Sequence, residues 1–254
     1  MKLTCSILVL VFSVSIAEVA AQKRRTTSLG NRSAATVKPR EIGSMAVVMD
    51  ETLAVLRIRP SLFADSVQRM HRGRRVRILG SAEADGVKFY KVAAPPNNSG
   101  WVQSDAVFGA FRESDEQRLA ILVQAADGFN QIELAAAFFE MYPVSKFRPA
   151  MLLLYGDLIE ETALKISRDA NSRLSRREMA ASGAPVHSYY LNFVSLDRYR
   201  KLGVRFLFNP ATRTFHYDGN AWNEIVTKFA AAPESAEARK RLDSLKEKLA
   251  KKAN

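Results

Sequence analysis

The chain has almost no cysteine: Cys5 is its one cysteine in 254 residues. It has three histidines, His71, His187 and His216, and none has a metal-ligand partner at helical spacing. A phosphate-cradling glycine loop and a G-x-S-x-G nucleophile motif are also missing. These absences disfavour a zinc site, a nucleotide-binding loop and the common hydrolases. We therefore expect no catalytic residue, no metal and no cofactor, and a protein that is not an enzyme.

Long apolar runs are equally scarce, and the one near the start, "SILVLVFSVSIA", follows the positive charge of Lys2. Its length suits the core of an export signal and is short for a membrane span. The small residues Val19 and Ala21 predict cleavage after Ala21, which makes residues 1–21 a signal peptide; the alternative is an uncleaved anchor. No later run is apolar for long enough to cross a membrane. Cleavage would also remove Cys5, and with it any disulfide or thiol nucleophile.

Charge is abundant, with a net value of +12 that is spread unevenly along the chain. Residues 22–44 hold six basic side chains against one acidic side chain, and they contain too few apolar residues to form a core. We expect a basic flexible linker there. Residues 45–108 carry nine basic and six acidic side chains. That modest excess disfavours nucleic acid as a partner, because phosphate binding needs concentrated positive charge.

Residues 45–108 alternate short apolar runs with turn signals, and the strand candidates are "AVVM", "AVLRI", "RRVRIL", "VKFYKVA" and "GWVQS". Short strands at this spacing predict a small antiparallel barrel. In "RRVRILG", Val76 and Ile78 alternate with Arg75 and Arg77. The arginines are therefore expected on the outer, solvated side of the barrel. The same alternation in "LRIR" predicts an inward leucine and isoleucine.

The order of these motifs resembles that of the bacterial SH3-like (SH3b) domain. The matching segments are an opening strand at Leu56–Ser61, a basic-glycine strand at Arg72–Ile78, an aromatic strand at Phe89–Val92 and a closing Gly-Trp-Val at Gly100–Val102. The resemblance implies a noncatalytic module of the bacterial periplasm or cell envelope. Such a module would bind cell-wall polymer, peptidoglycan above all, or an envelope protein.

The resemblance also implies four candidate ligand-binding side chains: Arg57, Arg59, Tyr90 and Trp101. Two other interpretations stay open at these positions. The arginines can simply cover the wet side of a sheet, since strands need a polar face. Trp101 can be an aromatic that closes the barrel, because large aromatic side chains more often pack in a core than bind a ligand.

Residues 112–254 show helical periodicity in four stretches, the first of which has a capping-box spacing from Ser114 to Gln117. A β-hairpin is predicted near 203–218. "FFEMYPVSKFRPAMLLLYGDLIEETA" resembles a tetratricopeptide (TPR) helix pair, which implies a surface for protein–protein interaction. The alternative is a plain helical bundle that stabilises the barrel.

The sequence thus predicts an α+β multidomain protein. An SH3-like barrel at residues 45–108 is followed at residues 112–254 by a mostly helical, TPR-like region with a small hairpin. Its predicted function is that of an exported, noncatalytic scaffold that binds cell-wall polymer or an envelope protein.

Two other functions remain open. One is an envelope enzyme with its site in the C-terminal region, built from His216, Tyr217 and Asp218. The other is a nucleic-acid-binding protein that uses the sheet arginines with their aromatic neighbours. The expected export of the protein argues against this second function. A group of carboxylates in the long helical stretch is expected to form a solvated face with i,i+4 pairing: Asp157, Glu160 and Glu161.

Overall fold

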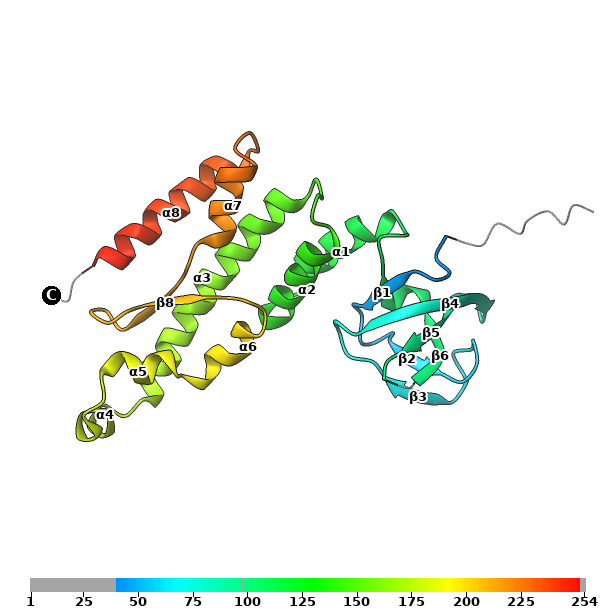
Figure 1. Cartoon of the computed structure of the whole chain (residues 1–254), viewed down its shortest axis with the longest axis horizontal. Coiled ribbons are helices and arrows are strands. Elements are labelled where there is room, and N and C mark those ends of the chain that lie inside the picture. Colours follow the sequence, from blue (N-terminus) through cyan, green and yellow to red (C-terminus); the bar gives the residue numbers. More distant parts are fainter. Residues whose placement is uncertain (1–39, 97, 252–254) are drawn as a thin grey trace, which may run out of the picture. The chain divides into compact units, whose positions relative to one another are not determined.

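The computed structural model describes residues 40–96 and 98–251. The expected signal peptide, Cys5 and nearly all of the basic linker lie outside the described residues. The described chain is mixed α and β. A sheet is built from strands between Met45 and Phe108, and helices with one small hairpin follow between Ser114 and Ala250 (Figure 1).

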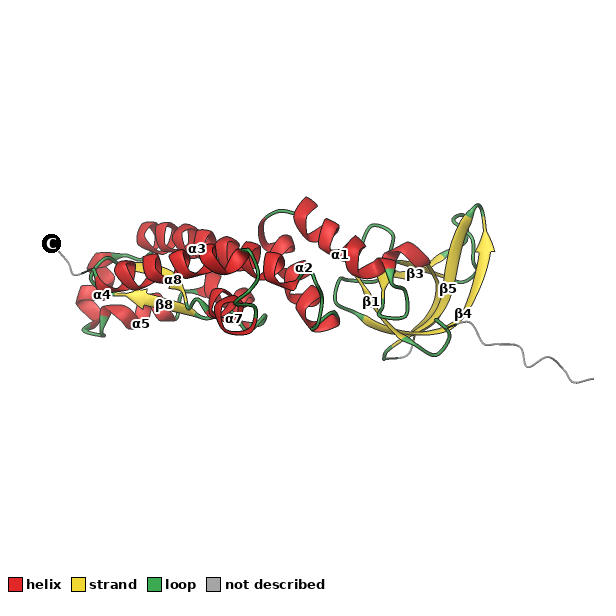
Figure 2. Ribbon diagram, turned by 90° about the horizontal axis from the view of Figure 1, so that it is seen from above, coloured by secondary structure: helices red, strands yellow, loops and turns green. Residues whose placement is uncertain are grey.

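The first part of the chain forms one curled antiparallel sheet (Figure 2). Its strand order is β3-β2-β6-β5-β4-β1-β7. The end strands β3 and β7 do not pair with each other, so the described sheet curls without closing. Its strands are β1 (Met45–Val48), β2 (Val55–Arg57), β3 (Ser66–Arg69), β4 (Arg75–Ala84), β5 (Val87–Ala94), β6 (Asn98–Gln103) and β7 (Val107–Phe108).

The predicted alternation along the strands is confirmed. Val76 and Ile78 of β4 are fully buried, whereas Arg75 and Arg77 point to solvent. The opening strand departs from the prediction, because Leu56 is buried but Ile58 is 52% exposed. The register shifts after Leu56 and β2 ends at Arg57, so the period of two does not continue into the following loop. Strand β3 was not predicted, because its sequence Ser-Val-Gln-Arg has a single apolar residue.

The inner side of the sheet is a compact apolar core, and β6 approaches β2 closely at Gly100. A Cβ atom at Gly100 would lie 2.7 Å from the carbonyl oxygen of Arg57 and 2.9 Å from Cγ of Leu56. Glycine is therefore required for β2 to lie this close to β6. That approach also fixes Arg57 opposite Trp101.

Eight α-helices follow in the described chain: α1 (Ser114–Ala125), α2 (Gly128–Met141), α3 (Arg148–Arg173), α4 (Arg176–Ser182), α5 (Val186–Leu191), α6 (Asp197–Arg200), α7 (Asn220–Lys228) and α8 (Glu234–Ala250). The predicted hairpin is present between α6 and α7 as β8 (Phe206–Asn209) and β9 (Thr214–Tyr217). Within the described residues, no helix combines the length and the apolar character needed to cross a membrane.

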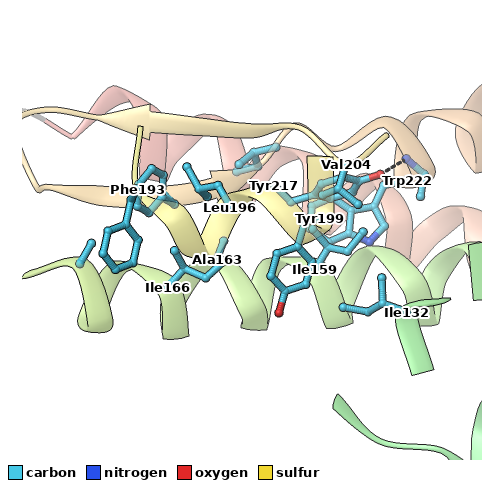
Figure 3. Packing of buried hydrophobic residues seen from close by; sticks show 14 of the residues in the cluster. Ile132, Ile159, Ala163, Ile166, Phe193, Leu196, Tyr199, Val204, Tyr217 and Trp222 are labelled. Carbon is cyan, nitrogen blue, oxygen red and sulfur yellow. Dashed lines mark hydrogen bonds between the residues drawn. The ribbon is translucent and has the colours of Figure 1, made fainter. Parts of the chain in front are cut away.

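Helix α3 is the centre of the helical part, because α2, α7, α8 and the hairpin all contact it (Figure 1). Its apolar face, which includes Ile159 and Ala163, packs under Tyr217 and Trp222 (Figure 3). A Cβ atom at Gly156 would lie 2.4 Å from Nε1 of Trp222, so the missing side chain lets α7 lie directly on α3. The buried indole fills the space that the glycine leaves.

The connection between the sheet and α1 is held by a buried carboxylate. Asp115 is fully buried and accepts hydrogen bonds from the backbone N–H of Gly109 at 3.0 Å, from Arg112 at 2.6 Å and from Arg118 at 2.9 Å. The capping box predicted from Ser114 is wrong: Glu113 is the N-cap residue and makes no side-chain capping bond. The buried Asp115 carboxylate instead connects the first turn of α1 to the residues that precede the helix.

We expect Gly100→Ala to destabilise the protein by about 1–3 kcal/mol, because the new methyl group collides with the backbone of β2. Urea unfolding at neutral pH measures this change. Gly80→Ala is the matched control, since a Cβ atom there would lie 3.9 Å from Cβ of Lys91, an ordinary contact. Equal stability of the two variants would contradict the close approach.

Candidate functional site

The outer side of the sheet carries a row of three large polar or aromatic side chains on three adjacent strands. Arg57 of β2 pairs with Trp101 of β6, and Trp101 pairs with Lys91 of β5. Residues that pair directly across antiparallel strands point to the same side of the sheet. We call Arg57, Trp101 and Lys91 the outer row.

The outer row is accessible. Lys91 is exposed, and Arg57 and Trp101 are partly exposed. The next outward pair on β5 and β6 is Ala93 with Ser99, two small residues. The small size of this pair leaves the indole open to a flat ligand on that side.

The cations of the outer row are not neutralised locally. Arg57 donates from Nη1 to the carbonyl oxygen of Ala64 at 2.7 Å, which anchors the loop between β2 and β3. Within the described residues, neither Arg57 nor Lys91 forms an ion pair with a carboxylate, in contrast to Lys88, which pairs with Glu41 at 2.6 Å. The exposed Arg59 also forms no such pair there, and it lies beyond the end of β2. A partly exposed tryptophan flanked by unpaired cations suits an anionic ligand.

The structure excludes Tyr90 from this surface. Tyr90 is 1% exposed and belongs to the core on the inner side of the sheet, opposite Val102. Its ring meets Phe111 edge-on at 6.2 Å. The expectation that Tyr90 binds a ligand beside Trp101 is therefore wrong: neighbours along a strand point to opposite sides, and Tyr90 is the inward neighbour of Lys91.

Lys91 is the residue of this row that the sequence interpretation missed. Its position directly after the aromatic pair of β5 could have indicated it, because the residue after an inward tyrosine points outward. Its neighbour Trp101 was left open between core and surface. The strand register places Trp101 on the outer side, next to two cations.

A second polar group lies in the helical part and is deeply buried. Glu160 of α3 is 8% exposed and His216 of β9 is 4% exposed. The Glu160 carboxylate accepts hydrogen bonds from Nδ1 of His216 at 3.0 Å, from Nζ of Lys248 at 2.8 Å and from the backbone N–H of Tyr217 at 2.8 Å. The expectation of a solvated Glu160 is therefore wrong, because the hairpin folds over this face of α3.

The charge of Glu160 is strongly favoured despite its position. Burial raises the pKa of the carboxyl, but the hydrogen bonds from His216, Lys248 and the backbone N–H of Tyr217 outweigh burial and lower the pKa to about 2. The remaining ring nitrogen of His216 lies 3.0 Å from the hydroxyl of Thr214. Each polar atom of this group has a protein partner, which indicates a structural connection between α3, β9 and α8.

The enzyme hypothesis grouped three residues that the structure separates. His216 faces Glu160, whereas Tyr217 and Asp218 line a hollow that His216 does not reach. Asp218 forms no hydrogen bond with His216 in the described chain, and its carboxylate accepts from Asn220 instead. In residues 40–96 and 98–251, no group of three or more His, Cys, Asp or Glu side chains could hold a metal ion.

Comparisons with known proteins give no family. No family model, no curated protein and no solved structure matches this chain. The interpretation of the outer row and of the buried group around Glu160 therefore depends on their own geometry.

We expect Glu160→Gln to destabilise the protein by about 2–3 kcal/mol at neutral pH, because the amide keeps the shape but leaves donors from His216 and Lys248 without a carboxylate. The folded-state pKa is lowered from 4.5 to about 2, so the stabilisation is complete above the unfolded value and is lost as the pH falls through that interval. The difference between wild type and variant should shrink over the same interval.

Urea unfolding followed by tryptophan fluorescence, from neutral pH down to about pH 2, measures both effects. Glu161→Gln is the matched control, because the Glu161 side chain is 60% exposed and pairs with Lys165 at 2.7 Å on the surface of the same helix. A pH-independent difference for Glu160→Gln would contradict the buried ionised carboxylate.

Proposed function

We propose that this protein is a noncatalytic binding protein of the bacterial cell envelope. Its seven-stranded sheet holds an anionic cell-wall polymer on the outer row, and its helical part contacts a protein partner. The observation that carries the proposal is the outer row itself: a partly exposed Trp101 between two cations without acidic partners in the described chain.

The chemistry of the row suits a polymer of sugars and carboxylates. The flat indole offers an apolar surface for the face of a sugar ring, and the flanking cations can each bind a carboxylate. Peptidoglycan carries both kinds of group. The resemblance of residues 45–108 to the SH3b family supports the same class of ligand.

The expected affinity is modest for one site and larger for a polymer. An exposed ion pair contributes roughly 0.2–1 kcal/mol and is screened by salt. The three side chains of the outer row can contact neighbouring groups of one polymer, and contacts to linked groups add without a further loss of translational freedom. A protein of this kind would therefore attach to an assembled wall better than to a single fragment.

The helical part supports the second half of the proposal less directly. Helices α1 and α2 pack against each other as a pair, and α7 and α8 form another pair. Val144 in the connection from α2 to α3 is 95% exposed, and Val194 before α6 is 69% exposed. Two single exposed valines are common on any protein surface, so the pairing of helices is the main support for this half of the proposal.

The test is co-sedimentation of residues 22–254 with purified cell-wall sacculi. We expect saturable binding that Lys91→Glu weakens by about 3–10-fold, because a repelled charge replaces an attracted one beside Trp101. Trp101→Ala, checked for folding by circular dichroism, should weaken binding by a similar factor. Arg57 is not substituted, because its bond to Ala64 holds a loop.

Arg168→Glu is the control, since Arg168 is an exposed residue of α3 and its substitution changes the net charge by the same amount. Loss of binding in this control as well would indicate attraction by total charge alone and would overturn the outer row as the site. Equal binding of wild type and Lys91→Glu would also overturn it. A single-stranded oligonucleotide that competes fully with sacculi would favour the nucleic-acid alternative.

A further inference from the structure

A hollow of about 210 Å³ opens in the helical part, away from the outer row. Five segments of the chain line it: α2, α3, the connection after α6, the end of β9 and the first turns of α7. Sites for drug-sized ligands usually measure roughly 300–1,000 Å³. This hollow therefore suits a compact ligand or the end of one side chain.

One pair of charges in its wall is already satisfied. Arg148 donates to Oε1 of Glu224 from Nη2 at 2.8 Å and from Nε at 2.9 Å, and both side chains are largely buried. The guanidinium also lies over the ring of Phe139, 5.1 Å from its centroid. An arriving ligand gains little from either group, because each already has its counter-charge.

Asp218 carries a negative charge in the wall of the hollow that no ion pair neutralises in the described chain. Its carboxylate accepts hydrogen bonds from the backbone N–H of Asn220, at 3.0 Å, and from the side-chain amide of the same residue. It forms no ion pair in the described chain, although Arg205 lines the same hollow from its exposed rim. Burial raises the pKa of Asp218, and the Asn220 hydrogen bonds and the more distant Arg205 offset only part of that cost. A desolvated carboxylate of this kind gains from a bound cation.

Two tyrosines complete the surface around that charge. Tyr155 lines the hollow, and its hydroxyl has no hydrogen-bond partner among the described residues. Burial and the nearby charge of Asp218 raise the pKa of Tyr155 to about 12, so its hydroxyl stays neutral. The hydroxyl of Tyr217 accepts a hydrogen bond from the backbone N–H of Ala221 at 2.8 Å, the dashed line in Figure 3. Aromatic surfaces beside a carboxylate favour organic cations.

We propose that this hollow binds a primary ammonium group, with Asp218 as its counter-charge and the Tyr155 hydroxyl as a hydrogen-bond acceptor. The ammonium group can belong to a free alkylamine or to a lysine-type side chain. An anion is disfavoured, because Asp218 repels it and the charges of Arg148 and Glu224 already neutralise each other. This site is independent of the outer row, and neither proposal needs the other.

The test is an NMR titration of residues 22–254 with butylammonium at constant ionic strength and neutral pH, followed at the backbone amides of Asn220 and Ala221. These amides donate to Asp218 and to Tyr217, so they report directly on the hollow. We expect saturable shifts in the millimolar range. Asp218→Asn should weaken binding at least about tenfold, because it removes the counter-charge and keeps the shape.

Tyr155→Phe is the second variant and removes the hydroxyl alone, which should weaken binding by a few-fold. Asp243→Asn is the control, since its carboxylate is exposed on α8 and pairs with Lys246 at 3.1 Å. Unchanged binding of butylammonium by both Asp218→Asn and Tyr155→Phe would overturn the proposal. So would the absence of shifts in the wild type.

Two further probes separate the alternatives. Butyrate has the same length and the opposite charge, and equal shifts with butyrate would overturn a cation site. Tetramethylammonium has no N–H donor, and binding as strong as that of butylammonium would overturn the hydrogen-bonded primary ammonium. The peptide Gly-Lys-Gly distinguishes the two sources: binding of both supports a site that admits a lysine side chain, and binding of butylammonium alone supports a site for free amines.

Discussion

The buried carboxylate of Glu160 is the interaction on which the helical part depends. It joins α3 to β9 through His216 and the backbone of Tyr217, and it joins α3 to α8 through Lys248. An ionised carboxylate inside a protein is stable only when donors surround it. The three segments must therefore fold together, and the end of β9 is brought to its place beside α7 as a consequence.

The hollow around Asp218 follows from that arrangement. Asp218 comes two residues after His216, so holding His216 on α3 carries Asp218 to the edge of the helical core. Trp222 then packs onto Gly156, which draws the first turn of α7 against α3. The same packing that stabilises the hairpin thus leaves the Asp218 carboxylate partly buried and without an ion pair in the described part of the chain. Binding sites often contain a charged group whose burial is unfavourable, because a ligand of opposite charge relieves that desolvation cost.

The sheet obeys a different constraint, which is the alternation of side chains across its two sides. Strand candidates and the outward arginines of β4 could be predicted from period-two patterns alone, and the hairpin near 203–218 could be predicted from its apolar runs and turn. Strand β3 could not, because it is a short edge strand with polar residues. Tyr90 was misplaced because aromatic character alone does not say which side of a sheet a residue faces.

The sequence by itself determined that a strand-rich part precedes a mostly helical part, the polar side of β4 and the scarcity of groups for metal or thiol chemistry. Local periodicity and composition carry these features, since they depend on residues close together in the chain. Only the tertiary structure decided that Trp101 lies between Arg57 and Lys91, and that Glu160 is buried while Glu161 is solvated. Those outcomes depend on which distant segment covers each residue, and neighbouring glutamates on one helix carry no local signal that distinguishes them.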